Sequence, residues 1–235
     1  MQEKALDASN GSGAGRGSAG TPRQELARIH ESPRREPSHL RETIMEAMLI
    51  ASGELGYREV SVSRVLEYYG GNRTQFYGLF ANKAECYAAA YRLEAGRLCG
   101  ALLGVAVAAG GWREGLRAAL GELAGFAAER PLAAKGLLIE VHVAGGPALA
   151  KREEVFEHLT RAVDGARRET ESRHSPPPMT ALFMVGAIEE CVCARLMDGD
   201  VEGLHAAIPE LAQMVVTAYF GDEAGREELA LARVE

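Results

Sequence analysis

Apolar residues recur with helical spacing over most of the chain beyond residue 37. In the first such segment they fall at positions i, i+3, i+4, i+7 and i+11, which places them on one face of an amphipathic helix. These residues are Ile44, Ala47, Met48, Ala51 and Leu55, and Ser38 is the expected N-cap. No stretch of useful length alternates between apolar and polar residues as a half-buried strand does. The pattern therefore predicts an all-α fold.

Short helices separated by glycine follow this first helix. A second helix is expected after Ser61 and ends at Gly70 and Gly71, and a third covers residues 72–80. Asn82 caps a long fourth helix, and Glu85 three residues later completes an expected capping box. Two short helices joined by a glycine turn and supported by a longer one describe a helix-turn-helix, whose second helix enters the DNA major groove.

The pattern divides the chain into three parts. Residues 1–37 are rich in Gly, Ser, Ala, Arg and Pro without an apolar period, and we expect a disordered arm. Residues 38–90 form the predicted helix-turn-helix domain, and residues 91–235 form a helical body for ligand binding and dimerisation. Beyond the fourth helix, breakers delimit five expected helices at residues 112–129, 131–143, 147–171, 179–197 and 204–220.

Three pieces of the helix-turn-helix segment carry a family resemblance. They are "LGY" after the first helix, "QFYGLF" after the turn at Gly70, and "NKAE" at the start of the fourth helix. About 50 of the 235 residues thus resemble the tetracycline-repressor (TetR) family of transcription regulators. The sequence departs from the family pattern at Gly71, so the turn is expected to pack differently. Gly78 and Leu79 replace bulkier polar or aromatic groups on the third helix, which removes side chains that could touch DNA and leaves the operator sequence unpredictable.

Several polar residues are candidates for DNA contact. Arg73, at the start of the third helix, can donate two hydrogen bonds to one guanine, and Thr74 and Gln75 can reach base edges or phosphates. Ser61 can offer its hydroxyl to a phosphate or act only as a cap. Arg64 is either a DNA contact or a solvated surface residue.

The family resemblance adds further expectations. It implies that Tyr77 and Lys83 bind phosphates, that the protein acts as a homodimer, and that the dimer binds a partly palindromic operator in double-stranded DNA. It also implies pairing through the last two helices, and the apolar residues of 179–197 lie on more than one face, as an interface helix requires. Glu189 and Glu190 interrupt this helix. They could face solvent, pair with Arg195 or line a pocket, and we favour solvent.

The helical body is expected to hold a small, apolar ligand of unknown identity. Candidate pocket residues are aromatic or polar side chains at otherwise apolar positions: Phe126, His142, Phe156 and Phe183. Each phenylalanine could equally be ordinary core packing, and a single histidine near the end of an apolar helix could be a satisfied core residue. Release of DNA by such a ligand would make the protein a repressor, the commoner mode in the family.

Charge limits how DNA could be bound. The formal net charge is −7, and residues 98–235 carry 13 basic and 21 acidic side chains, whereas residues 38–97 carry seven of each. DNA contact must therefore be local and oriented. The alternative is a helical small-molecule or protein-binding module that no longer binds DNA, which Gly71, Gly78 and the neutral helix-turn-helix segment favour slightly.

Other classes find little support in the sequence. No G-x-S-x-G, glycine-rich phosphate loop or H-E-x-x-H motif occurs, so we expect neither an enzyme nor a cofactor. The four cysteines lack the spacing of a metal site. The longest apolar stretches are too short for a bilayer and the N-terminus lacks a signal-peptide core, so we expect a cytoplasmic protein without a membrane segment.

Overall fold

The computed structural model describes residues 37–170 and 176–231. Within them, α-helices and one 3-10 segment are the only regular secondary structure, which confirms the all-α prediction. In the same residues no helix combines the length and the apolar character needed to cross a bilayer. The arm predicted over residues 1–37 lies outside the described residues except for Pro37.

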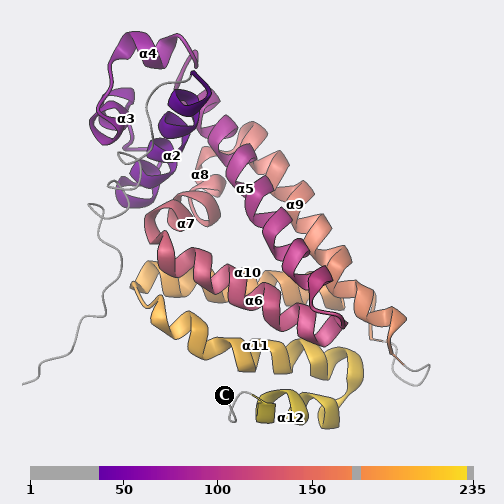
Figure 1. Ribbon diagram of the computed structural model, residues 1–235. Helices are drawn as coiled ribbons and strands as arrows, with labels where there is room; N and C mark the ends of the chain where they lie inside the picture. Colours follow the sequence, from indigo (N-terminus) through magenta and orange to yellow (C-terminus); the bar gives the residue numbers. More distant parts are fainter. Residues whose placement is uncertain (1–36, 171–175, 232–235) are drawn as a thin grey trace, which may run out of the picture.

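The helix-turn-helix occupies one end of the molecule (Figure 1). It consists of α2 (Pro37–Leu55), α3 (Val62–Tyr69) and α4 (Arg73–Tyr77). Helix α2 begins one residue before Ser38, so Ser38 lies within the helix and is not its N-cap. The core around these helices is buried, and its members include Ile44, Met48, Leu49, Phe76 and Phe80.

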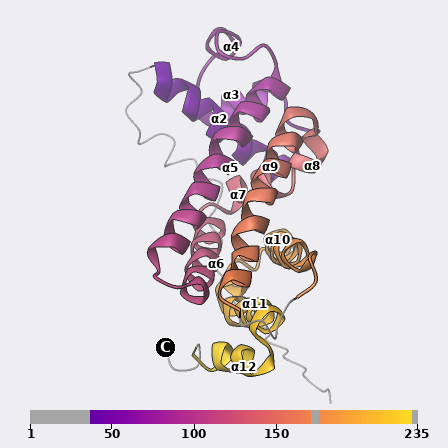
Figure 2. The same ribbon diagram turned by 90° about the vertical axis from the view of Figure 1, so that its right-hand side faces the viewer.

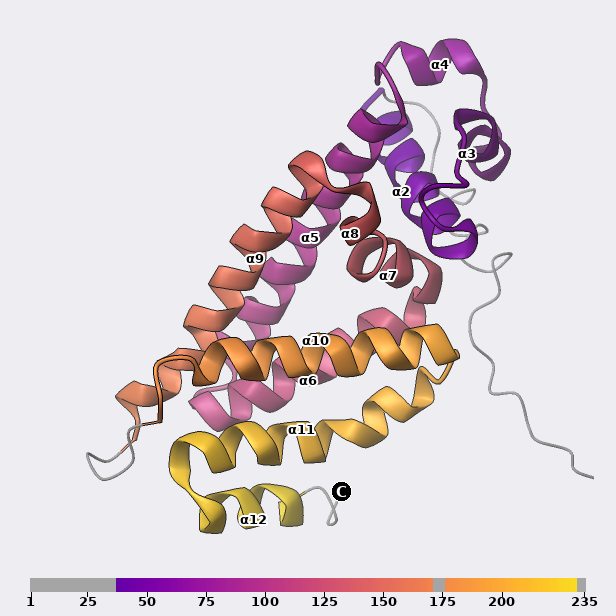
Figure 3. The ribbon, with the colours of Figure 1, turned by 180° about the vertical axis from the view of Figure 1, so that it is seen from behind.

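Two long helices connect this end to the rest of the body. Helix α5 (Lys83–Ala108) and helix α9 (Gly146–Asp164) lie side by side and run away from the helix-turn-helix (Figures 1 and 3). The expected helix over residues 147–171 ends earlier than predicted. Its α-helical part stops at Asp164, and the chain continues as a 3-10 turn, η1 (Gly165–Arg168).

Helices α6 and α7 bring the chain back between the two ends. Helix α6 (Trp112–Glu129) has the predicted bounds. The single helix expected over residues 131–143 is instead two, α7 (Pro131–Leu138) and α8 (Val141–Ala144). The break places the carboxylate of Glu140 where it accepts a hydrogen bond of 2.6 Å from the backbone N–H of Tyr57. Helix α7 also packs closely along α2, so it supports the helix-turn-helix from the side of the body (Figures 2 and 3).

The C-terminal helices form the opposite end of the molecule. Helix α10 (Thr180–Asp198) lies against α9 and α7, α11 (Glu202–Phe220) packs on α6, and α12 (Asp222–Leu231) folds back along α11 (Figure 3). Helix α12 was not predicted, because its sequence is mostly polar. Its anchor is Glu228, whose fully buried carboxylate accepts hydrogen bonds from Arg113 and Arg117 of α6. A helix held in place by an ion pair needs no regular spacing of apolar residues, so the sequence pattern does not reveal it.

Candidate nucleic-acid interface and ligand cavity

Helix α4 presents a polar face to solvent at the far end of the helix-turn-helix. Arg73, Thr74, Gln75 and Tyr77 are all exposed, whereas Phe76 between them is fully buried. The Tyr77 side chain is 52% exposed, and its ring packs edge-on against Phe76 at 5.4 Å between centroids. The structure thus brings four of the predicted DNA-contacting residues onto one short exposed segment.

The start of α4 is held by a complete capping box. The Asn72 side-chain oxygen accepts a hydrogen bond of 3.0 Å from the backbone N–H of Gln75, and the Gln75 side-chain oxygen accepts one of 3.1 Å from the backbone N–H of Asn72. The capping box predicted from the sequence was at Asn82, at the start of α5. There the box is incomplete, because the Glu85 carboxylate accepts from the backbone N–H of Ala81 rather than that of Asn82. Since Gln75 uses its oxygen in the cap, its amide N–H groups remain to donate.

The turn between α3 and α4 explains the unusual Gly71. Gly70 has φ of +70°, a left-handed conformation that suits glycine. A Cβ atom at Gly71 would overlap the ring of Tyr69, whose hydroxyl donates a hydrogen bond of 3.1 Å to the Asn72 carbonyl. The Tyr69 ring therefore fills the space that a side chain at position 71 would need. The turn is therefore well packed without a side chain at position 71.

Helix α3 supplies the partners of α4. Ser61 caps α3, accepting a hydrogen bond of 3.3 Å from the backbone N–H of Arg64. The Arg64 guanidinium lies 2.8 Å from the Glu67 carboxylate, and both side chains are more than half exposed. Arg73 donates a hydrogen bond of 2.9 Å to the Ser63 hydroxyl, which steadies its guanidinium at the start of α4.

Lys83 has a structural role that the sequence did not suggest. Its ammonium donates hydrogen bonds to the backbone carbonyls of Tyr57, Arg58 and Val60 at 2.9, 3.2 and 2.8 Å. It also lies 4.5 Å from the centre of the Tyr57 ring. An ammonium has three N–H donors, so these bonds use all of them. Lys83 ties the start of α5 to the loop between α2 and α3.

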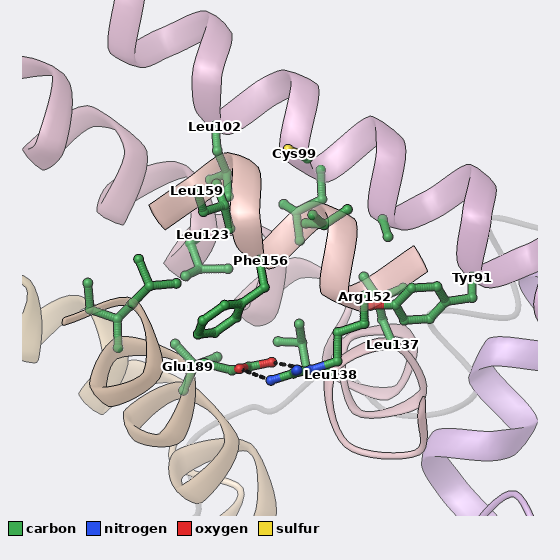
Figure 4. A pocket seen from close by; sticks show the side chains of 16 residues that line it. Tyr91, Cys99, Leu102, Leu123, Leu137, Leu138, Arg152, Phe156, Leu159 and Glu189 are labelled. Atoms are coloured by element: carbon green, nitrogen blue, oxygen red, sulfur yellow. Dashed lines mark hydrogen bonds and ion pairs between the residues drawn. The ribbon is translucent and has the colours of Figure 1, made fainter. Parts of the chain in front are cut away.

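The helical body contains two adjoining apolar cavities. The first has a volume of about 90 Å³ and lies between α5, α6, α7, α9 and α10 (Figure 4). The second, of about 290 Å³, extends toward the opposite end of α6, where Trp112 lines it. The two cavities adjoin, because five residues line both of them: Leu102, Leu123, Leu159, Val185 and Ile188.

Only one of the four predicted pocket residues lines this pair of cavities. Phe156 lines the first cavity, whereas His142 is exposed and borders an outer hollow that also includes Phe156, Arg152 and Glu189. Phe126 is half-buried and packs into the surrounding core, with the Arg130 guanidinium 5.5 Å from its ring centre. Phe183 is 68% exposed on the outer face of α10 and lines neither cavity. The structure thus places His142 and Phe183 outside these two cavities, and a role of either residue in ligand binding stays a prediction.

The polar end of the first cavity is formed by an ion pair between Arg152 and Glu189, which was not predicted from the sequence. The Arg152 guanidinium donates hydrogen bonds from Nε and Nη2 to the two carboxylate oxygens of Glu189, 37 residues away (Figure 4). The expectation that Glu189 faces solvent is wrong, whereas Glu190 is exposed as expected. The buried Tyr91 also lines this end, and burial raises the pKa of its hydroxyl above the ordinary range.

Comparison with known proteins identifies the architecture. No protein-family model matches the sequence, and no curated protein matches it. Among solved structures, the chain is similar to the fatty acid degradation regulator FadR from Bacillus halodurans, with a TM-score of 0.64, 18% identity, and coverage of 74% of this chain and 96% of that one. It is also similar to a TetR family transcription regulator from Marinobacter aquaeolei, with a TM-score of 0.62, 23% identity, and coverage of 76% and 94%. The chain has a TetR-type fold.

Within this TetR-type fold, polar contacts tie the helix-turn-helix to the body. Arg130, at the junction of α6 and α7, donates hydrogen bonds to Glu46 of α2 at 3.0 Å and to Glu94 of α5. The Tyr87 hydroxyl of α5 donates a hydrogen bond of 2.6 Å to the Gly136 carbonyl of α7. Helices α6 and α7, which line the cavities, are thus directly bonded to the elements that carry α4.

Proposed function

We propose that this protein is a homodimeric, sequence-specific DNA-binding transcription regulator, a repressor that a small molecule releases from its operator. The observation that carries the proposal is the exposed face of α4, where Arg73, Thr74, Gln75 and Tyr77 stand above the buried Phe76. An exposed polar helix on a rigid helical support is the arrangement by which helix-turn-helix proteins read the major groove.

The polar residues of this face have distinct proposed roles. Arg73 reads a guanine, because its guanidinium starts α4 and is steadied by Ser63. Thr74 and the amide N–H groups of Gln75 reach bases or phosphates, and Tyr77 donates its hydroxyl to a phosphate. Ser61 and Arg64 lie exposed at the start of α3 and contact the flanking backbone. Lys83 adds positive charge nearby, but a direct phosphate contact would require it to release one of its carbonyl partners.

The exposed apolar residues of α10 and α11 support dimerisation. A single chain leaves several large apolar side chains exposed on these helices, with exposed fractions of 41 to 68%: Leu182, Phe183, Met197 and Met214. Such residues on neighbouring helices are typical of a surface that another protein chain covers. A two-fold dimer would present two α4 helices and so favour a partly palindromic operator.

The contacts between cavity and helix-turn-helix support control by a ligand. Helix α6 lines both cavities through Leu123, and it ends at Arg130, which bonds to Glu46 of α2. A ligand that favours a different position of α6 would therefore shift α2 and, with it, α4. A difference of about 1.4 kcal/mol in ligand binding between the two conformations changes operator affinity tenfold.

A mobility-shift assay with DNA from around the protein's own gene tests the proposal. We expect the dimer to bind a discrete fragment, Arg73→Ala to bind it more weakly and less selectively, and Arg226→Ala to behave as the wild type. Arg226 is a suitable control because it is an exposed arginine on α12, at the opposite end of the molecule. Failure to bind any fragment, including fragments captured from fragmented genomic DNA, would reject the proposal.

The alternative of a helical module without DNA binding is less well supported. Its basis in the sequence was the pair Gly71 and Gly78. The Tyr69 ring accounts for Gly71, and Gly78 ends α4 with ordinary helical angles. Neither glycine therefore indicates a degraded motif.

A further inference from the structure

We propose that the ligand of the body is an elongated, uncharged amphiphile with one hydrogen-bonding end, which contacts Arg152, Glu189 and Tyr91. This inference rests on the proposed function, since it names the class of molecule that would release the protein from DNA. It assigns the apolar part of the ligand to the two adjoining cavities and its polar part to the end that Arg152 and Glu189 line.

The shape of the cavities sets the shape of the ligand. The first cavity reaches Phe156 and Arg152, and the second extends to Trp112. Leu159 lines both of them. A compact molecule would fill only one cavity, whereas a chain of methylene groups can extend past Leu159 and remove water from both. Burial of apolar surface then supplies most of the affinity.

The charges at the end lined by Arg152 and Glu189 set the charge of the ligand. Among the residues that line the first cavity, Arg152 and Glu189 are the only ones that are charged, and each side chain is 21% exposed. Their charges cancel, and both carboxylate oxygens are occupied. A carboxylate ligand could accept only from the remaining N–H groups of Arg152 and would place its charge beside that of Glu189. An ammonium ligand would place its charge beside the Arg152 guanidinium. Either brings like charges together at a partly buried site, which disfavours binding of the charged ligand.

An uncharged polar group can bind without breaking the ion pair. The bonds to Glu189 use Nε and Nη2 of Arg152, so the two hydrogens on Nη1 are left for another acceptor. Tyr91, which is only 3% exposed, lines the same end of the cavity as Arg152 (Figure 4). Its hydroxyl can both donate and accept. A hydroxyl, ketone, ester or amide group fits this pair of partners.

A competing arrangement would place an anionic end at the opposite end of the second cavity. Arg168 lines that end and is exposed. A fatty-acid-like molecule could lie with its tail toward Arg152 and its carboxylate beside Arg168 in water. Both arrangements use the same apolar cavities, and they differ only in the charge of the head group and the arginine that senses it.

Calorimetric titration of the full-length dimer with matched ten-carbon probes distinguishes these two arrangements of the ligand. The probes are 1-decanol, decanoate and decylammonium, each below its aggregation concentration. We expect 1-decanol to bind at least tenfold more tightly than either ion. We also expect 1-octanol to bind about fifteenfold more weakly than 1-decanol, at about fourfold per methylene group. Decanoate binding most tightly, and losing that affinity in Arg168→Gln, would overturn the proposal, as would failure of all three probes to bind.

Variants that change the charges of the ion pair provide a second test. Glu189→Gln leaves Arg152 unpaired and should shift preference to decanoate, whereas Arg152→Gln should shift preference to decylammonium. The control Glu190→Gln alters an exposed carboxylate on the same helix and should leave the preference unchanged. If a single variant fails to fold, the neutral double variant Arg152→Gln/Glu189→Gln serves instead and should lose discrimination against both ions. Unchanged preference in folded variants would contradict the role of the ion pair.

The two proposals fail in distinguishable ways. Titration needs no DNA, so selective binding of 1-decanol by a protein that binds no DNA would leave the ligand class standing and reject the proposed function. Conversely, specific DNA binding that a charged amphiphile relieves, with no binding of 1-decanol, would keep the proposed function and reject the ligand class.

Discussion

Gly53 of α2 and Gly136 of α7 lie opposite each other, and the backbones of the two helices touch there. A Cβ atom at Gly53 would overlap the carbonyl of Leu132 and crowd the backbone nitrogen of Gly136, and a Cβ atom at Gly136 would overlap the carbonyl of Leu49. Because main-chain atoms cannot yield as a flexible side chain can, α7 and the helix-turn-helix form one packed unit. Any displacement of α7 by a ligand would therefore move α2 and, through α3, α4.

Substitution at this crossing should be costly. Gly136→Ala is expected to lower the free energy of unfolding by about 1–3 kcal/mol through overpacking, measured by urea denaturation. Gly121→Ala on α6 is the matched control, because no atom lies within 4 Å of a Cβ atom there. That control should gain about 0.5–1 kcal/mol from the better helix propensity of alanine. Equal stability of the two variants would contradict the close crossing.

Arg73 and Lys83 should separate DNA binding from stability. Arg73→Ala should weaken operator binding by about 1–3 kcal/mol and relax preference at one base pair per half-site, with thermal stability unchanged. Lys83→Ala should lower thermal stability, because it leaves three backbone carbonyls without their donor, and should weaken binding to all sequences alike. If the two variants affect operator binding and thermal stability equally, the distinct roles assigned to Arg73 and Lys83 are wrong.

The buried carboxylate of Glu228 should be essential for α12. Glu228→Ala is expected to lower the free energy of unfolding by about 3–5 kcal/mol, since it leaves Arg113 and Arg117 facing each other without their shared partner. Glu227→Ala is the control, because that side chain is 63% exposed and should contribute at most about 1 kcal/mol. Chemical denaturation of both variants checks this, and comparable losses would contradict the anchor.

The dimer should depend on the outer face of α10. Phe183→Glu is expected to give a monomer in light scattering at micromolar concentration, because it places a charge in the proposed apolar interface. Val143→Glu, at a 42% exposed apolar position on α8, should remain dimeric. Dimeric Phe183→Glu would move the interface to another surface.

High pH should destabilise the fold through its buried thiol. Burial raises the pKa of Cys86 from 9.0 to about 12, so between these values the unfolded chain ionises while the folded chain does not. The stability that Cys86 contributes is therefore complete below pH 9 and falls by at most about 1.4 kcal/mol per pH unit above it. Cys86→Ala should show a smaller loss between pH 9 and 10 in denaturant titrations. An identical pH slope in the two proteins would contradict this assignment.

Local interactions explain why much of the fold could be predicted. The bounds of α6 and the caps at Ser61 and Asn82 all depend on residues within a few positions of each other. The break after Leu138 and the helix α12 could not be predicted in this way, because Glu140 reaches back to Tyr57 and Glu228 reaches back to Arg113.

The same distinction between local and long-range interactions applies to the candidate sites. The sequence by itself determined the all-helical class, the helix-turn-helix segment and the polar residues of α4, since Phe76 and the glycines around α4 dictate which side chains point outward. Only the tertiary structure decided that Lys83 ties down a loop, that Phe183 lies outside the cavities, and that Arg152 and Glu189 form an ion pair at one end of them. The reason is physical: helical periodicity and caps are encoded over a few residues, whereas a cavity and its ion pair exist only once helices distant in the sequence have packed together.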